Sequence, residues 1–226
     1  MSDPQRLIVF DMDGTLVDSQ ATIVGCMQAG FAAVDQAPPD RARILSIVGL
    51  SLNRAVAQLA PQLDAVTRDR IVQTYKDSFL AQRETFGSSG SSPLFPGVRC
   101  VLDQLHSIPH WLMGIATGKS RRGLDALVDA HELRHFFVTQ QVADYHPSKP
   151  HPSMLQAAMD EAGVSPSDTI MIGDTTFDLD MATAAGVPFI GVSWGYHPIS
   201  SLKGARAIVE EIATLPDVLN GIWKSA

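Results

Sequence analysis

The sequence has little of what several classes of protein require. It holds only two cysteines, Cys26 and Cys100, among 226 residues, too few for a disulfide framework, so a reducing, cytoplasmic setting is expected. The pair also lacks the spacing of a metal–thiolate site. No apolar run reaches the roughly 18 residues of a membrane-spanning helix. The short apolar stretch near the N-terminus ends in acids, which is unlike a secretion signal.

Clustered positive charge is also missing. The formal net charge is −7, and the 17 lysines and arginines form no cluster, which argues against a nucleic-acid surface. The negative charge does not exclude an anionic small molecule, because a bound divalent cation and one or two local cations reverse the sign inside a single pocket. We therefore expect a small-molecule partner, no nucleic acid and no membrane, for a monomer or a homodimer.

The sequence does contain the pattern of a short apolar strand, then of a helical stretch, and then of strands that alternate regularly with helices. Residues 6–10 (RLIVF) predict a buried strand, and from 19 to 86 the apolar spacing predicts helices and no strand. A Gly/Ser-rich stretch at 86–93 predicts a flexible turn or hinge. Beyond it, strands are expected at 112–116, 136–139, 169–172, 188–192 and 205–209, and helices at 121–131, 152–162, 177–185 and 210–222.

This alternation predicts an α/β fold, a Rossmann-like, doubly wound parallel sheet with helices on both faces. The first strand precedes the helical stretch and the others follow it. The simplest organisation is therefore a core of residues 1–15 and 90–226, interrupted by an α-helical cap of residues 16–86, with residues 87–89 as the hinge. Ligands of such sheets bind at the carboxyl ends of the strands, below the predicted cap.

Two carboxylates follow the first predicted strand. In extended backbone, side chains two residues apart point the same way, so Asp11 and Asp13 are expected to face one pocket, and Gly14 lets the chain turn away. Two acids this close repel each other, and a hard divalent cation such as Mg²⁺ relieves the repulsion. For this pair alone, an acidic turn at a strand end is the simpler explanation.

Three later segments each place further polar groups after a predicted strand. Thr117 and Gly118 offer a hydroxyl and backbone amides to phosphate oxygens, although a helix cap explains the same segment. Three prolines restrict the loop that contains Lys149. Either this loop fixes the lysine ammonium beside a phosphoryl group, or Lys149 is a solvated surface residue. Asp174 at a strand tip and Asp178 four residues later supply metal ligands, or cap the next helix.

Together these segments are far more specific than any one of them. In order along the chain, DMDGT, ATG, the Lys149-Pro150 segment and GDTTFD resemble the four signature motifs of the haloacid dehalogenase (HAD) superfamily. The helical insertion after the first motif is similar to the type-1 cap of its phosphoglycolate phosphatase-like members. LFPGV (94–98) and KPHP (149–152) also resemble that subgroup.

The resemblance implies a mechanism that these residues are able to support. Asp11 would attack phosphorus and form an aspartyl-phosphate, and Asp13 would act as general acid and then as general base. The phosphoryl oxygens would be held by Thr117, Lys149 and the backbone amides of Met12 and Gly118. Mg²⁺ would be held by the Asp11 carboxylate, the Asp13 carbonyl and Asp174, with Asp178 in support.

Asp13 decides which members of the superfamily are candidates. Dehalogenase-like and phosphonatase-like members lack this acid, so we expect a phosphatase for a small phosphorylated metabolite, with 2-phosphoglycolate as the best single guess. Arg54, in a segment where related caps often meet the substrate, is a candidate clamp for a substrate carboxylate, or else a solvated helix arginine. A β-phosphoglucomutase-like sugar-phosphate mutase and a non-catalytic binding protein on the same fold are the alternatives.

Overall fold

The centre of the protein is a six-stranded parallel sheet, and the computed structural model describes residues 4–224. The strand order is β3-β2-β1-β4-β5-β6, and every neighbouring pair is parallel. This order confirms the predicted Rossmann-like fold. The strands are β1 (Arg6–Phe10), β2 (Trp111–Thr117), β3 (Phe137–Val142), β4 (Thr169–Gly173), β5 (Phe189–Val192) and β6 (Ala207–Val209).

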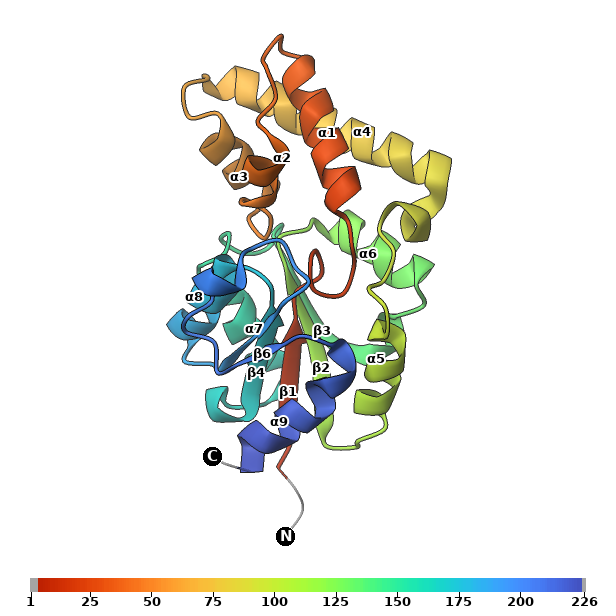
Figure 1. The fold of residues 1–226 in the computed structure, drawn as a ribbon, viewed down its shortest axis with the longest axis vertical. Helices are drawn as coiled ribbons and strands as arrows, with labels where there is room; N and C mark the ends of the chain where they lie inside the picture. Colours follow the sequence, from red (N-terminus) through yellow and green to blue (C-terminus); the bar gives the residue numbers. More distant parts are fainter. Residues whose placement is uncertain (1–3, 225–226) are drawn as a thin grey trace.

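Helices cover both faces of the sheet (Figure 1). The alternating side chains of β1 show how: Ile8 and Phe10 belong to one apolar cluster and Leu7 and Val9 to another. The first cluster includes residues of α5 (Val98–His106), α6 (Arg121–Ala130) and α9 (Leu215–Lys224). The second includes residues of α7 (Ser153–Ala162) and α8 (Thr176–Ala185). Short 3₁₀ turns lie at Arg134–Phe136, Pro166–Asp168, Ile199–Ser201 and Ile212–Thr214.

A second group of helices stands over the carboxyl ends of the strands (Figure 1). It consists of α1 (Gln20–Ala32), α2 (Arg41–Leu45), α3 (Leu52–Leu59) and α4 (Ala65–Ser91), and no strand occurs among these described residues, as the sequence predicts. The group has its own apolar cluster, in which Ile23, Met27 and Phe31 of α1 pack with Ile71 of α4. No helix within residues 4–224 is both long enough and apolar enough to span a membrane.

The Gly/Ser-rich stretch is the main departure from the predicted elements. The sequence predicts a turn over 86–93, whereas α4 continues to Ser91 and is interrupted only at Gly87, whose φ of 72° is not helical. The two chain segments that connect cap and core, residues 16–18 and 93–95, run side by side. The Asp18 amide donates to the Pro93 carbonyl (2.8 Å), and the Phe95 amide donates to the Leu16 carbonyl (3.0 Å).

The last predicted helix also begins later than expected. It starts at Leu215, with Pro216 in its first turn, rather than at residue 210. Proline lacks an amide hydrogen and is tolerated in the first turn of a helix but not in its interior. A helix that began at 210 would place this proline in its interior, so the chain forms a 3₁₀ turn (Ile212–Thr214) first.

Candidate active site

Asp11 lies directly beyond the buried end of β1. Its amide donates to the Ile172 carbonyl of β4 (2.9 Å), and its side chain is 1% exposed. The chain then turns tightly at Gly14, which has a φ of +82°. A Cβ atom at this position would lie 2.3 Å from the Asp174 carboxylate, so both the backbone conformation and the available space require glycine.

Lys149 is the counter-charge of the buried site. Its Nζ lies 3.0 Å from Asp11 Oδ1 and 2.6 Å from Asp178 Oδ1, and all three side chains are buried. Burial alone would lower the pKa of Lys149, but Asp11 and Asp178 raise it above its usual range, so the ammonium stays charged. Burial is the main cause that raises the pKa of Asp11 to about 7. The charge of Lys149 lowers this pKa only in part, and repulsion from Asp178 and Asp13 raises it further.

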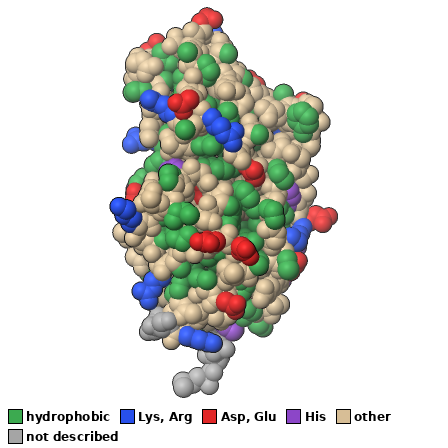
Figure 2. All heavy atoms as spheres, viewed as in Figure 1, with side chains coloured by type: hydrophobic (Ala, Val, Ile, Leu, Met, Phe, Trp, Pro, Cys, Tyr) green, Lys and Arg blue, Asp and Glu red, His purple; other side chains and the backbone are tan. Residues whose placement is uncertain are grey.

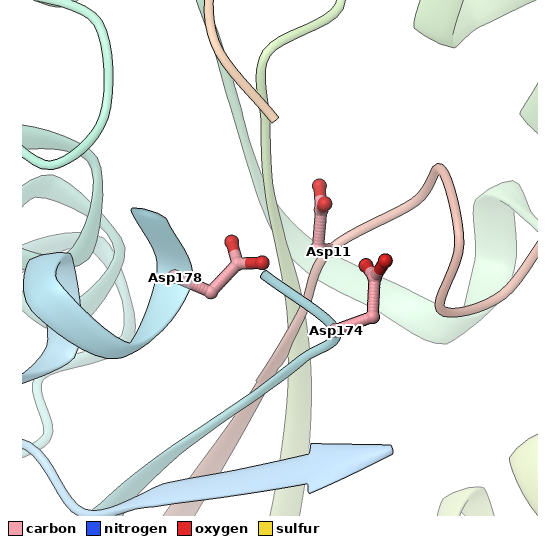
Figure 3. A group of neighbouring side chains, drawn as sticks. All are labelled: Asp11, Asp174 and Asp178. Atoms are coloured by element: carbon pink, nitrogen blue, oxygen red, sulfur yellow. The ribbon is translucent and has the colours of Figure 1, made fainter. Parts of the chain in front are cut away.

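Three buried carboxylates form a site with the donor set of a divalent cation. Asp11, Asp174 and Asp178 each offer an oxygen within 4.8 Å of the others. Figure 3 shows Asp11 and Asp174 beyond the ends of β1 and β4, with Asp178 beside them in the first turn of α8. Asp11 Oδ2 is buried with no hydrogen-bonding partner among residues 4–224. Burial, followed by repulsion from Asp178 and Asp11, raises the pKa of Asp174 well above its usual value. These oxygens fit a hard cation such as Mg²⁺, which would relieve the repulsion.

The loops around the carboxylates hold them in place. Asp174 accepts hydrogen bonds from the Thr15 hydroxyl (3.1 Å) and the Tyr196 amide (2.7 Å). Asp178 Oδ2 accepts from the amide and the hydroxyl of Thr175 in a capping box at the start of α8. Asp178 therefore caps a helix, as its sequence position suggests, and also contacts Lys149. Its role as a metal ligand stays a prediction.

Asp13 lies apart from the three clustered acids and is held by groups that sequence reasoning missed. Its Oδ1 is 2.9 Å from Lys119 Nζ and also accepts a hydrogen bond from the Ser19 hydroxyl. The signal for Lys119 was its place directly after Thr117 and Gly118, in the same loop. For Ser19, which begins the cap, the sequence carried no comparable signal.

The predicted phosphate-binding loop lies at the end of β2. Thr117 is 1% exposed, and its hydroxyl accepts a hydrogen bond from the Lys119 amide (3.3 Å). A Cβ atom on Gly118 would lie 2.6 Å from the carbonyl oxygen of Gly49 in the cap, so only glycine permits this approach of cap and core. Met12 is fully buried, and the contribution of the Met12 and Gly118 amides to phosphate binding stays a prediction.

A cavity of about 610 Å³ lies between the cap and these loops. Asp13, Gly118 and Lys119 line it from the core. Arg54 is exposed and does not line the cavity, because α3 turns Ala55, Val56 and Leu59 inward instead. The basic residues that reach the cavity from α4 and α6 are Lys76, Arg83 and Arg122, none of which the sequence singled out.

Comparison with curated proteins identifies relatives along nearly the whole chain. A profile of the family described as "Haloacid dehalogenase-like hydrolase" matches residues 8–192. The "Probable phosphatase IndB" of Dickeya dadantii is 35% identical over 222 residues, covering 96% of this chain and 95% of that protein. The "Phosphoglycolate phosphatase" of Xylella fastidiosa is 32% identical over 196 residues, covering 85% of this chain and 82% of that protein.

Solved structures agree with this relationship. A hydrolase of the haloacid dehalogenase-like family from Streptococcus pneumoniae superimposes with a TM-score of 0.81 at 25% identity, over 95% of this chain and 98% of that one. A structure described as a predicted phosphatase from Clostridium acetobutylicum shares the fold, with a TM-score of 0.83 at 23% identity, over 98% of this chain and all of that one. The chain therefore belongs to the haloacid dehalogenase-like hydrolase family, and its relatives there include phosphatases.

Proposed function

We propose that this protein is a Mg²⁺-dependent phosphatase that hydrolyses a small phosphomonoester through an aspartyl-phosphate on Asp11. One observation carries the proposal: a buried carboxylate oxygen, Asp11 Oδ2, is left without a partner while Lys149 and two further acids surround the same side chain. A buried acceptor without a partner is costly in a folded protein, so we infer that a cation or a phosphoryl group completes the site.

In the first half of the reaction, an Asp11 oxygen attacks phosphorus and the bond from phosphorus to the ester oxygen breaks. Asp13 gives its proton to the departing alkoxide. Lys149 holds Asp11 in place and offers charge to the phosphoryl oxygens, together with the Thr117 hydroxyl. Asp11, Asp174 and Asp178 would hold Mg²⁺, with the Asp13 carbonyl in support, and the ion supplies charge neutralisation for an incoming dianion.

In the second half, a water molecule gives its proton to Asp13 and attacks phosphorus. The bond from phosphorus to Asp11 breaks, and inorganic phosphate leaves. Asp13 Oδ1 lies 2.9 Å from Lys119 Nζ. For this oxygen to exchange a proton with the ester oxygen or with water, Lys119 has to move away from it once the substrate is bound.

The names of relatives, rather than the geometry of the site, suggest which phosphoester is the substrate. Several curated relatives carry the name "Phosphoglycolate phosphatase", so 2-phosphoglycolate is the reference substrate for this proposal. A cytoplasmic metabolite fits the shortage of cysteines. The oligomeric state, monomer or homodimer, stays a prediction.

Phosphate release from a panel of phosphomonoesters, with Mg²⁺ and with EDTA, tests the proposal. We expect turnover with Mg²⁺ and none with EDTA. Turnover that is independent of metal, or none on any ester, would contradict it. The same assay separates the sugar-phosphate mutase, which would need an activating bisphosphate and would isomerise its substrate without releasing phosphate.

A further inference from the structure

We infer that the preferred substrate is a phosphomonoester with an apolar or aromatic body, larger than glycolate, and with a second anionic group at its far end. The inference rests on the proposed phosphatase function and specifies its substrate class. It comes from the cavity between cap and core rather than from the catalytic loops.

The size of the cavity is the first observation. Its volume of about 610 Å³ lies within the range of roughly 300–1,000 Å³ that suits a ligand much larger than a two-carbon ester. The cavity reaches the catalytic loops through Asp13 and Gly118, so one molecule is able to place its phosphate there and its body under the cap. A glycolate body would leave most of this space to water.

The lining of the cap side is the second observation. Tyr75 and Phe79 of α4 line the cavity and stack on each other, with ring centroids 6.3 Å apart and an interplanar angle of 18°. Met27 of α1 and Val48 of the α2–α3 connection add further apolar surface. Such a wall gains little from a polar two-carbon acid, whereas an apolar or aromatic body releases water from it and packs on the rings.

The charge of the cavity is the third observation. Its lining includes two acids, and both are engaged: Asp13 by Lys119, and Asp144 by the Arg121 amide. Three further cations line it, Lys76, Arg83 and Arg122, and none of them pairs with an acid among the described residues. Within residues 4–224, the Arg83 guanidinium donates only to the Ser88 hydroxyl (3.0 Å).

These cations lie on the open side of the cavity. Lys76 and Arg122 are exposed and Arg83 is partly exposed, whereas Lys149 serves the reacting phosphate from a buried position. Lys119 lies between the two regions, with its Nζ 5.3 Å from the centroid of the Phe79 ring. In a protein of net charge −7, this local excess of positive charge favours an anion at the mouth, beyond the apolar wall.

Three esters of primary alcohols test the inference, because their leaving groups are closely matched. They are 2-phosphoglycolate, benzyl phosphate and 4-carboxybenzyl phosphate, each assayed for kcat/KM with Mg²⁺. We expect benzyl phosphate to exceed 2-phosphoglycolate about tenfold, and the carboxylate to add a further factor of about 3–10, on the scale of one buried ring and one exposed ion pair.

Two variants of α4 assign these gains. Phe79→Ala should raise KM for benzyl phosphate about tenfold and affect 2-phosphoglycolate less. Arg83→Gln should remove the advantage of 4-carboxybenzyl phosphate over benzyl phosphate. Phe86→Ala is the matched control, since Phe86 lies on the same helix, is 67% exposed and does not line the cavity. Thermal unfolding of each variant shows that the cap remains folded.

The outcomes separate this inference from the proposed function. A kcat/KM for 2-phosphoglycolate equal to or above that for benzyl phosphate would overturn the inference, but the protein would still be a phosphatase. Equal kcat/KM values for benzyl phosphate and 4-carboxybenzyl phosphate would overturn the inference that the substrate carries a second anionic group. A protein that hydrolyses none of the three esters, nor any of a wider panel, overturns both the inference and the proposed function.

Discussion

On the core side of the cavity, buried charges face each other at short distances, whereas the cap side is largely apolar and its cations pair with no acid among residues 4–224. Asp11, Lys149 and Asp178 are all fully or almost fully buried and in direct contact. Arg83 and Lys76 of the cap have no acidic partner among the described residues. Removing one partner of a buried ion pair is strongly destabilising, so the core side suits chemistry common to every substrate, and the cap side suits selection among substrates.

The difference between the two sides of the cavity predicts how variants of each side behave. Changes on the core side should lower kcat for every ester, because they remove groups that touch the reacting phosphate. Changes on the cap side should alter KM and depend on the ester. A core variant with a substrate-dependent effect, or a cap variant with a uniform loss of kcat, would show that the division is wrong.

The largest effect in this series is expected from Asp13→Asn. The amide cannot supply or accept the proton, so kcat should fall by about 10²–10⁴-fold for every ester. Rapid-quench measurement should locate the loss in both half-reactions. Asp103→Asn, on an exposed position of α5, is the matched control and should behave like the wild type. A loss confined to one ester would contradict the general acid–base role.

A slightly smaller effect is expected from Lys149→Met. The change removes the only cation that pairs with Asp11 among residues 4–224 and one donor to the phosphoryl group, so kcat should fall by about 10²–10³-fold. The unfolding free energy should also fall, because Asp11 and Asp178 lose the cation between them. Lys203→Met, at an exposed position, controls for the loss of one positive charge.

Lys119→Met should have a smaller effect on kcat than the two preceding variants. It tests the division between core and cap, because Lys119 contacts both sides of the cavity. Its ammonium pairs with Asp13 and lies over the Phe79 ring. We expect a loss of about tenfold in kcat for all esters and, in addition, an ester-dependent change in KM. An unchanged kcat for every ester would mean that Lys119 only packs beneath the cap.

The smallest effect in the series is on stability, and it depends on pH. Without a cation, Asp11 has a pKa of about 7 in the folded protein against an ordinary 3.8, so the folded state binds this proton more tightly. Its contribution to stability is present at low pH and is lost as pH rises from about 4 to about 7. Mg²⁺ must displace the same proton, so stabilisation by Mg²⁺ should grow as pH rises through 7.

Thermal unfolding with Mg²⁺ and with EDTA measures this effect at about pH 5.5 and about pH 8. A hundredfold excess of Mg²⁺ over its Kd would add about 2.7 kcal/mol to the unfolding free energy at the higher pH. In Asp11→Asn the dependence on pH should weaken, and the part that remains should come from Asp174, whose pKa is also raised. Equal stabilisation at both pH values in the wild type would contradict the placement of the cation beside Asp11.

The same division between core and cap explains how much the sequence predicted. Asp11, Thr117 and Asp174 were found because parallel strands end at one edge of the sheet, so residues far apart in the chain converge there. The pairing of Phe10 with Ile115 and Ile172 shows that convergence directly. A short motif after each strand is therefore sufficient to locate the chemistry.

The cap is different, because helix-to-helix packing decides which residues face the cavity. The position of Arg54 in the sequence predicts a contact with the substrate, but the buried face of α3 carries Ala55, Val56 and Leu59 instead. The Gly/Ser run was expected to be a turn, yet its serines continue the helix, with the Ser91 hydroxyl donating to the Ser88 carbonyl (3.2 Å). Only Gly87 adopts the conformation that the composition suggested.

The most direct test of the central claim is to trap the covalent intermediate on Asp11. The protein is mixed with Mg²⁺ and a hydrolysed ester, quenched in acid within one turnover, and digested for mass spectrometry. We predict one added phosphoryl group on the peptide that contains Asp11, absent with EDTA and absent in Asp11→Asn, which should have no turnover. A phosphoryl group on another residue, or near-normal turnover of Asp11→Asn, would contradict the account.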